Sequence, residues 1–576
     1  MKYPLLNELP VTREMIDSFG GYNHNLRIGA GEFYDMENLT SAHYPVLSPR
    51  PRRGIFATPE RPQGLIAKDA LCYVDGGDFV MGEYRVAMQL SRDAAPKTLI
   101  SMGAYVIIMP DKKYINTADI TDYGSIEASV TTITPVTFEL CKIDGTGYTD
   151  AVAQDTEPGN PANMDLWIDT SSVPNALKQY STTNAMWVSI ATTYIKISAS
   201  GLGKPFSVGD GVTISGVSAV EGLNNTMIVW DRGDDYIVVT GIIDRVTTQE
   251  AAITVARRMP NMDFIVESGN RLWGCRYGTD VDGNMVNEIY ASKLGDFKNW
   301  NCFMGISTDS YAVTVGTDGQ FTGAITHLGS PLFFKETCMH KVYGNTLPFG
   351  VQDTACRGVQ KGCGGSLAIV NEVLYYKSRS AVCAYDGSLP VEISTALGEV
   401  VYSDAVAGAI GNKYYISMKD GGGVYHLFVY DTAKGMWHRE DNTQAVSFCS
   451  CRGDLYFIDA ADDKIKTVLG TGTLEGVPVR WMAETGVIGT DSPDKKYISR
   501  LDVRMNVPIG TTVDFYIQYD SEEEWEMLFS LDGHTLRSFT VPIRPHRCDH
   551  FRLRIEGDGP AKVYSICKNT EQGSEV

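Results

Sequence analysis

The side chains that could bind a metal or act in catalysis are widely dispersed along this chain. Nine histidines are spread over 576 residues, and the closest grouping is "RPHRCDH", where His546 and His550 bracket Cys548. Imidazole and thiolate ligands at alternate positions of a strand could hold Zn²⁺. The same run also fits a turn that leads into a strand. We favour this second interpretation and expect no metal site there.

A second run, "DVDGNMVNE", places oxygen ligands at alternate positions, as a calcium-binding loop does. Asp280, Asp282 and Asn284 alternate correctly. However, the glycine stands at the fourth position of the run and not at the sixth, and no glutamate closes a loop of about twelve residues. The run therefore favours a solvent-exposed hairpin tip.

Catalytic motifs are also missing from the sequence. It contains no Gly-x-Ser-x-Gly, no His-Glu-x-x-His and no phosphate-binding loop. The 12 cysteines include no Cys-x-x-Cys pair, so we expect buried free thiols. We predict that the chain is not an enzyme and has no catalytic residue, no cofactor and no metal.

Aromatic side chains could instead bind sugars, by stacking an indole ring on a carbohydrate ring. Trp437, in "GMWHRED", and Trp525, in "SEEEWEMLF", are candidates. Both stand in stretches with the alternation of a strand, which favours packing inside the fold.

The overall composition is that of a folded protein with a strongly acidic surface. Apolar residues make up 43% and the formal net charge is −20 at pH 7. A surface of this charge disfavours binding to nucleic acid by charge attraction. No apolar run reaches the roughly 18 residues of a membrane helix, and residues 1–10 lack the apolar stretch of a signal peptide. We expect synthesis in the cytoplasm and no membrane insertion.

The elements that would position these side chains are predicted to be strands. Short apolar stretches rich in Tyr, Val and Ile alternate with turns that contain Gly, Asp and Asn, and there are 57 glycines. Only "TREMIDSF", residues 12–19, suggests a helix.

A loose repeat indicates how the strands are arranged. In each unit a strand of small side chains is followed by a tight turn and a strand that contains an aromatic residue. The units span residues 64–76, 99–116, 264–278, 323–336, 366–388, 405–418 and 445–460. The later units are spaced by about 40 residues, which is typical of one propeller blade per unit. The sequence does not predict the number of blades.

These patterns predict an all-β chain: a β-propeller with an inserted small β domain and a C-terminal β-sandwich. The Thr/Ser/Gly-rich stretch between the second and third units favours an insertion, and long alternating strands near the end favour the sandwich. The expected ranges are an extended N-terminal segment at 1–62 that enters the first blade, propeller at 63–117 and 259–477, the inserted domain at 118–258 and the sandwich at 478–576.

The N-terminal segment contains a Pro/Arg run, "LSPRPRRG", at residues 47–54. Proline cannot donate a ladder hydrogen bond, so this run should be extended along a surface. Arg50, Arg52 and Arg53 could contact an acidic neighbouring subunit through their guanidinium groups. Alternatively, they pair with acids of the same chain.

The same region resembles the start of tail-tube nozzle proteins from short-tailed bacteriophages and related prophages. The resemblance rests on "FGGYN" at 19–23, "MENL" at 36–39 and the Pro/Arg run. The matching positions are Gly20, Gly21, Asn38, Arg50, Pro51 and Gly54. The corner reads Arg-Pro-Arg-Arg-Gly here and departs from the tighter family pattern.

Residues 159–190, "GNPANMDLWIDTSSVPNALKQYSTTNAMWVSI", resemble a small β module of phage tail and fibre proteins. By this resemblance Trp167, Tyr180 and Trp187 would form its aromatic core.

Together the two resemblances imply a virion structural protein that forms a ring, a hexamer by resemblance, in the phage tail. DNA would pass through the ring during ejection, and the partners would be further copies of the chain, the head–tail adaptor or connector, and tail fibres. The alternative is an adhesin of the tail that binds host-surface glycans. A propeller hydrolase is the third hypothesis, which the missing catalytic motifs disfavour.

Overall fold

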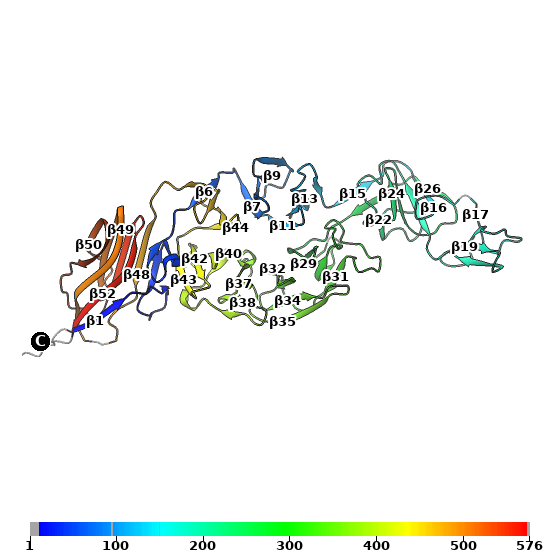
Figure 1. Cartoon of the computed structure of the whole chain (residues 1–576). Helices are drawn as coiled ribbons and strands as arrows, with labels where there is room; N and C mark the ends of the chain where they lie inside the picture. Colours follow the sequence, from blue (N-terminus) through cyan, green and yellow to red (C-terminus); the bar gives the residue numbers. More distant parts are fainter. Residues whose placement is uncertain (1–10, 94–95, 149, 281, 492–493, 573–576) are drawn as a thin grey trace, which may run out of the picture.

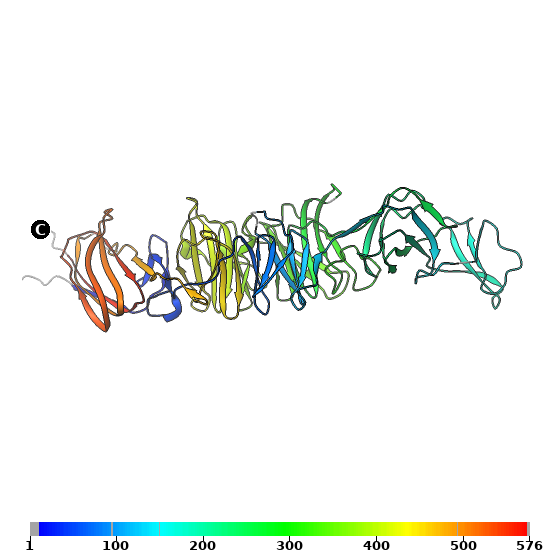
Figure 2. The ribbon, with the colours of Figure 1, turned by 90° about the horizontal axis from the view of Figure 1, so that it is seen from above.

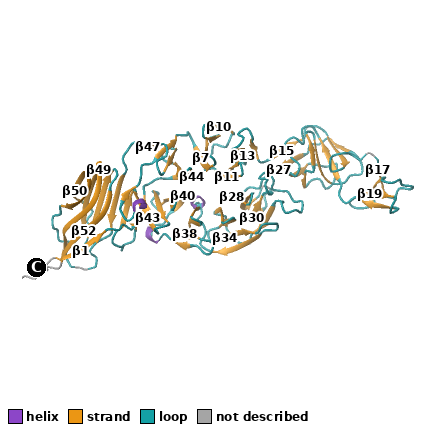
Figure 3. Ribbon diagram, in the orientation of Figure 1, coloured by secondary structure: helices purple, strands orange, loops and turns teal. Residues whose placement is uncertain are grey.

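The chain folds into three β-rich units arranged one after another along a single axis (Figures 1 and 2). The computed structural model describes residues 11–93, 96–148, 150–280, 282–491 and 494–572. Within these ranges the regular structure is β-strand, apart from three single-turn 3-10 helices (Figure 3). The turns are η1 (Ser41–His43), η2 (Gly364–Ser366) and η3 (Thr395–Leu397). The fold is all-β, with a propeller, an inserted β domain and a C-terminal sandwich, as the sequence predicts.

The central unit is a propeller of seven blades in the described residues. The first two blades are β7 (Pro62–Ala67), β8 (Leu71–Asp75), β9 (Asp78–Met81) and β10 (Tyr84–Ala87), then β11 (Thr98–Met102), β12 (Tyr105–Met109), β13 (Lys113–Asn116) and β14 (Tyr123–Ser125). The third and fourth are β28 (Phe264–Ser268), β29 (Arg271–Thr279), β30 (Met285–Ala291) and β31 (Tyr311–Thr314), then β32 (Gly323–His327), β33 (Ser330–Phe334), β34 (Cys338–Tyr343) and β35 (Gly350–Ala355).

The remaining three blades complete the ring. The fifth and sixth are β36 (Ala368–Val370), β37 (Val373–Lys377), β38 (Val382–Tyr385) and β39 (Val391–Glu392), then β40 (Ser403–Ile410), β41 (Lys413–Lys419), β42 (Tyr425–Asp431) and β43 (Met436–Arg439). The seventh is β44 (Ala445–Cys451), β45 (Asp454–Asp459), β46 (Lys464–Thr467), β6 (Gly54–Ala57) and β47 (Thr473–Leu474). Each of the seven sequence units begins one blade.

The ring closes through contacts between the first strands of successive blades. β7 contacts β11, β11 contacts β28 and β28 contacts β32, while β32 reaches η2, the turn before β36. β36 contacts β40, β40 contacts β44, and β44 returns to β7. Apolar side chains fill the spaces between blades; Trp273 and Ile289 of the third blade pack with Phe333 and Val342 of the fourth. Each blade therefore buries its faces against its neighbours.

The C-terminal unit is a sandwich organised around one long strand, β49 (Lys496–Tyr519). Its first half pairs with β52 (Lys562–Gln572), its second half with β51 (Phe551–Asp558), and both halves pair with β50 (Glu526–Val541). Alternate side chains of β49 point inward, and Leu501 and Phe515 from the two halves line the same apolar interior. One strand thus contributes to both layers.

The N-terminal segment runs through the sandwich and the propeller and does not lie on one surface. β1 (Val11–Ile16) pairs with β52, so the helix suggested by "TREMIDSF" is wrong there; Val11–Ile16 form an edge strand. β2 (Gly21–Tyr22) pairs with β43 of the sixth blade, and β3 (Glu32–Glu37) pairs with β48 (Arg480–Thr485) of the sandwich. Because β2 also pairs with β3, one continuous sheet crosses from the propeller into the sandwich.

The rest of this segment leads into the ring. β4 (Leu39–Thr40) and β5 (Ser48–Pro49) form a small hairpin, and β6 then pairs with β46 as a strand of the seventh blade. The segment enters the last blade in chain order, although it directly precedes the first. The pairing of β6 with β46 joins early and late strands of the chain in one blade, and so links the seventh blade to the segment that precedes the first.

The inserted domain contains three sheets that share no strand with the blades. The first is β15 (Ala128–Thr131), β27 (Thr254–Arg257), β22 (Gly211–Ser215) and β23 (Thr226–Ile228); the second is β24 (Asp231–Gly233), β25 (Tyr236–Thr240), β21 (Tyr194–Ser198), β16 (Val136–Cys141) and β26 (Thr247–Gln249). The third, at the far end of the molecule, is β17 (Ala151–Gln154), β18 (Leu166–Asp169), β19 (Ala176–Ser181) and β20 (Met186–Ser189). The expected start at residue 118 is too early, since β14 still belongs to the second blade.

The chain enters and leaves this domain at adjacent points, because Ala128 and Arg257 are register partners in β15 and β27. The domain has its own buried core, which includes Phe138, Ile197 and Val255.

We therefore expect replacement of residues 127–257 by a short Gly/Ser linker to leave the propeller folded, with a closure cost of only about 0.6 kcal/mol per doubling of linker length. Thermal unfolding followed by circular dichroism measures this.

A shorter deletion gives the matched control. Removal of Ala368–Glu392 takes out one blade and should abolish cooperative unfolding of the ring. If the chain without residues 127–257 is also unfolded, or if the isolated 127–257 fragment melts without cooperativity, then the inserted domain depends on the propeller.

Candidate functional site

The arginines singled out from the sequence meet an acidic pair of the sixth blade. Arg53 places Nη2 3.0 Å from Glu440 Oε2 and Nη1 2.9 Å from Asp441 Oδ2. Arg50 Nη2 lies 3.2 Å from the same Asp441 oxygen. Arg53 also donates from Nη1 to Thr443 Oγ1 and lies over the Phe457 ring. The cluster joins the entry to β6 with the loop after β43.

This cluster is buried, and its charged groups shift one another's pKa values. The side chains of Arg53 and Glu440 are 4% and 3% exposed. Burial raises the pKa of Asp441, but Arg53 and Arg50 outweigh it and hold that pKa at about 2. Burial lowers the pKa of Arg53, but Asp441 and Glu440 raise it by more, so the pKa ends above its ordinary value. Asp441 and Arg53 are therefore both charged at neutral pH.

The three candidate assembly contacts thus lie in two different environments. Arg50 and Arg53 pair with acids of their own chain, which was the alternative interpretation of the sequence. Arg52 is exposed. A contact strip made of all three guanidinium groups is not available to a neighbouring subunit, because two of them are already bound to carboxylates.

The three candidate core aromatics of the inserted domain are brought together on its third sheet. The Trp187 ring lies 5.5 Å from Trp167 and 5.3 Å from Tyr180, centroid to centroid. Trp167 is buried, and Lys178 lies over its ring. The main core of the domain is formed instead by aliphatic side chains and Phe residues. From this sheet, Ile168 and Leu177 are buried in it, and Ala151 and Leu166 pack against it. The aromatic cluster is a separate, partly exposed one.

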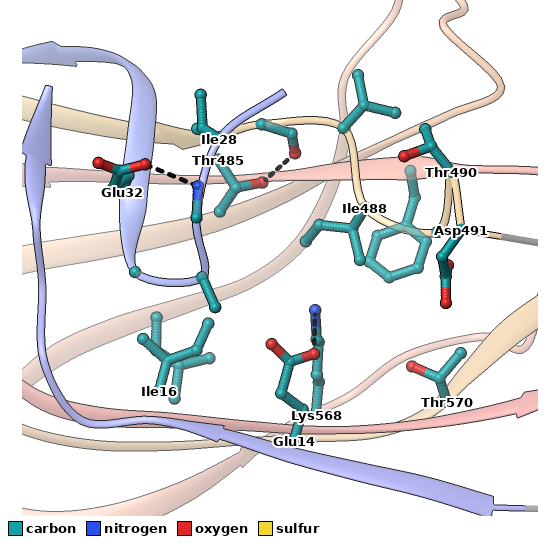
Figure 4. Close-up of a pocket in the computed structure, with 18 of the residues that line it drawn as sticks. Glu14, Ile16, Ile28, Glu32, Thr485, Ile488, Thr490, Asp491, Lys568 and Thr570 are labelled. Carbon is teal, nitrogen blue, oxygen red and sulfur yellow. Dashed lines mark hydrogen bonds and ion pairs between the residues drawn. The ribbon is translucent and has the colours of Figure 1, made fainter. Parts of the chain in front are cut away.

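A concavity lies between the N-terminal segment and the sandwich (Figure 4). It has a volume of about 350 Å³. β1 and β52 form one wall, residues 28–33 a second, and residues 485–491 a third. Ile16, Ile488 and Ile566 provide apolar lining, and the space adjoins the apolar interior of the sandwich.

The polar groups of this pocket are largely paired with one another. Lys568, which is 7% exposed, places Nζ 2.9 Å from Glu14 Oε2. Glu32 accepts hydrogen bonds from the backbone N–H of Gly29 and from Asn23 Nδ2, at 2.7 and 2.9 Å. An apolar floor with paired charges at the rim is suited to binding an apolar side chain of a partner. The lining residues come from both ends of the chain, so no local sequence signal could reveal it.

The propeller axis offers little for acid–base chemistry. In the described part of the chain, the first strands of the blades carry two carboxylates, Glu267 and Asp404. Asp404 pairs with Lys419, and Glu267 accepts from the backbone N–H of Asn270 at 2.9 Å. Each carboxylate thus has a partner of its own.

The remaining sequence candidates are accounted for by packing. His546 lies against the Tyr519 ring, Cys548 is buried, and His550 is hydrogen-bonded to Ser521. No group of three or more His, Cys, Asp or Glu side chains among the described residues could hold a metal ion. Asp280 and Asn284 lie in the hairpin between β29 and β30, where Asp280 accepts from the Asn284 backbone.

The tryptophans considered for sugar stacking are also covered. Trp437 is 2% exposed and donates from Nε1 to the Ile393 carbonyl, and Arg554 lies over the Trp525 ring.

Ten of the 12 cysteines are buried and the other two are half-buried, as expected for free thiols. No helix of the described residues is long and apolar enough to cross a membrane.

Comparison with known protein families gives no match, and comparison with curated proteins gives none either. Solved structures do show similarity in fold. An exo-beta-1,3-galactanase from Phanerochaete chrysosporium is 7% identical, with 53% of this chain and 94% of that chain covered and a TM-score of 0.22. An engineered glycoside hydrolase with endo-xylanase and exo-arabinofuranosidase activity is 9% identical, with coverage of 55% and 98% and a TM-score of 0.21. Raptor from Chaetomium thermophilum is 9% identical, with coverage of 73% and 29% and a TM-score of 0.29.

These neighbours correct one prediction. The sequence motifs predicted that the chain is not an enzyme, and this is contradicted because several of the structures with a similar fold are glycoside hydrolases. Active sites vary among proteins of one fold, and missing linear motifs do not exclude a site assembled from distant residues. The similarity is confined to the fold and gives this chain no substrate.

Proposed function

We propose that the chain is a structural subunit of a phage tail that assembles into a ring around the path of the DNA. The observation that carries the proposal is the continuous sheet through β43, β2, β3 and β48, which joins the propeller to the sandwich. With the inserted domain in line at the other end, this makes a long, stiff subunit (Figure 2). Such a subunit is suited to form the wall of a tail, which must resist mechanical force.

Charge and surface also support the proposal. With a net charge of −20, the inner surface of a ring of these subunits would not attract DNA, since attraction to phosphates comes from Lys and Arg. In the described part of the chain β1 pairs with β52 alone, which leaves its other edge open. Val11 and Met15 on this strand are 56% and 61% exposed. An open edge strand with exposed apolar side chains is a site where another chain can add.

The edge of β1 and the adjoining pocket are therefore the surfaces where we place the contact between copies. Glu14 and Ile16 of the same strand line that pocket. A strand from a neighbour would pair with the β1 backbone and could place an apolar side chain on the pocket floor. Tail fibres or an adaptor would meet the opposite end, where the aromatic cluster of the inserted domain lies.

Charge placed on this edge should weaken assembly. We expect the purified chain to form closed oligomers at micromolar concentration, and Met15→Lys to raise the concentration needed by about tenfold or more, equivalent to about 1.4 kcal/mol. Mass photometry measures the oligomer fraction, and negative-stain electron microscopy shows whether the particles are rings.

Met285→Lys is the matched control, because Met285 is 72% exposed at the start of β30, in the propeller. It adds the same charge away from the edge and should leave assembly unchanged. A wild-type chain that stays monomeric at all concentrations, alone and with tail components, would contradict the proposal. Equal effects of the two substitutions would place the contact elsewhere.

A further inference from the structure

Three side chains between the third and fourth blades form a continuous line of hydrogen bonds. Thr317 Oγ1 lies 2.9 Å from His340 Nε2, and His340 Nδ1 lies 2.5 Å from Asp353 Oδ1. A hydroxyl, an imidazole and a carboxylate in this order form the arrangement that activates a hydroxyl nucleophile. The sequence analysis missed it, since the residues are separated along the chain and match no motif.

Two residues of this line, His340 and Asp353, are held in place by strands of the fourth blade. His340 in β34 and Asp353 in β35 are direct register partners, so their side chains lie side by side on one face of the fourth blade. Thr317 belongs to the loop that joins the third blade to the fourth. Its carbonyl accepts from Lys335 Nζ at 2.6 Å and from Asn287 Nδ2 at 2.7 Å, which holds the loop against the blade.

The protonation pattern of the line follows from its chemistry. A carboxylate only accepts, so His340 donates from Nδ1 to Asp353 and keeps its lone pair at Nε2 for the Thr317 hydroxyl. His340 is fully buried, and burial lowers its pKa more than Asp353 raises it. The imidazole is therefore a neutral base at pH 7. Cys338 Sγ lies 3.8 Å from the same Nε2 and is a weaker second neighbour.

The hydroxyl end of the line belongs to a partly accessible loop. Thr317 is half-buried, whereas Asp318 and Gly319 are exposed. The described residues supply no acceptor for the backbone N–H groups of Asp318 and Gly319. Gly319 has φ +92°, a left-handed conformation that favours glycine. Free N–H groups beside a nucleophile are the donors that can stabilise an oxyanion.

We propose that Thr317 is the nucleophile of an acyl-transfer site, with His340 as general base and Asp353 as the positioning residue, and that its substrates are small carboxylic esters. The Thr317 oxygen attacks the ester carbonyl carbon while its proton passes to His340 Nε2. The C–O bond to the alcohol then breaks, and the alcohol leaves with the proton from Nε2. Water repeats the sequence on the acyl-threonine, which releases the carboxylic acid and restores the hydroxyl.

This activity goes beyond a structural role in a tail and does not depend on it. The same contacts could serve only to pin the loop between two blades, and the experiment separates these outcomes. The full-length chain is treated with a fluorophosphonate probe, and the modified peptide is identified by mass spectrometry. In parallel, release of p-nitrophenol from p-nitrophenyl acetate is followed.

We expect the probe on Thr317 in the wild-type chain and on no residue of this cluster in Thr317→Val, which keeps the shape and removes the hydroxyl. Thr317→Ser should retain labelling, because it keeps the nucleophile. Asp353→Asn should slow labelling and ester hydrolysis by about 10²-fold or more, because the base loses its orientation. Gln320→Ala, a change at an exposed neighbour outside the proposed site, should change neither rate.

Two results would overturn the proposal. One is a wild-type chain that remains unlabelled and hydrolyses the ester no faster than Thr317→Val. The other is labelling of Cys338 or Lys335 in place of Thr317. Either would show that the line of hydrogen bonds serves only to hold the loop.

Discussion

Replacing Arg53 with alanine is expected to lower the free energy of unfolding of the propeller by about 3–5 kcal/mol. The substitution removes the guanidinium that pairs with Glu440 and Asp441, and it leaves the buried Glu440 side chain without its closest cation. Arg50 also pairs with both acids, with Nε 3.6 Å from Glu440 and Nη2 3.2 Å from Asp441, but a single guanidinium carries one positive charge against two carboxyl groups. The loss falls on the seventh blade, where β6 follows directly after Arg53. Urea denaturation followed by tryptophan fluorescence measures the change.

Arg52→Ala is the matched control, one residue away and exposed. It should change the free energy of unfolding by no more than about 0.5 kcal/mol. Similar effects for the two variants would show that the cluster does not hold the ring closed.

The same cluster predicts a dependence on pH. The pKa of Asp441 is held at about 2 in the folded chain, below its ordinary value near 4. A carboxyl group whose pKa is lowered by folding stabilises the folded state above its unfolded pKa. That contribution is lost as pH falls from about 4 to 2. Arg53→Ala should therefore lose less stability than the wild-type chain over this range.

The second large effect is expected at the junction of the inserted domain. Asp210, 3% exposed, pairs with Arg257, and it accepts from Asn299 Nδ2 at 3.0 Å and from the Ser207 backbone at 2.9 Å. Asp210→Ala leaves the buried Arg257 guanidinium without its carboxylate. We expect the inserted domain to lose about 3–5 kcal/mol of stability. Limited proteolysis and urea denaturation report this.

Asp234→Ala provides the comparison for this site. Asp234 is 73% exposed and lies 3.6 Å from Arg232, so its ion pair is screened by water and should contribute about 0–1 kcal/mol. If Asp210→Ala is as stable as Asp234→Ala, the inserted domain is not anchored through Asp210.

The propeller could be predicted because each blade is a local structure. Its strands are consecutive in the chain, and their alternating side chains and glycine turns are visible within about 40 residues. The long strand β49 was visible for the same reason, since stretches such as "SRLDVRMNV" alternate with the period of a strand. The insertion boundary was missed by several residues because β14 is short and half-exposed.

The pairing of the N-terminal segment could not be predicted, because its partners lie hundreds of residues away. Nothing in "VTREMI" identifies β52 as its neighbour, and nothing near Arg53 identifies Glu440. The pocket and the Thr317 line share this property. Each is assembled by tertiary contacts between residues that carry no signal in their own surroundings.

The pairing of β1 with β52 and of β6 with β46 has a consequence for how the chain is made. The ribosome synthesises β1 and β6 long before their partners β52 and β46, which lie between Lys464 and Gln572. At about 5–20 residues per second, these first strands wait for roughly 20–100 s without a partner. The ring and the sandwich can both be completed only after residues 464–572 have been translated. Unfinished chains therefore lack the finished docking edge, and the order of synthesis itself delays assembly until the subunit is complete.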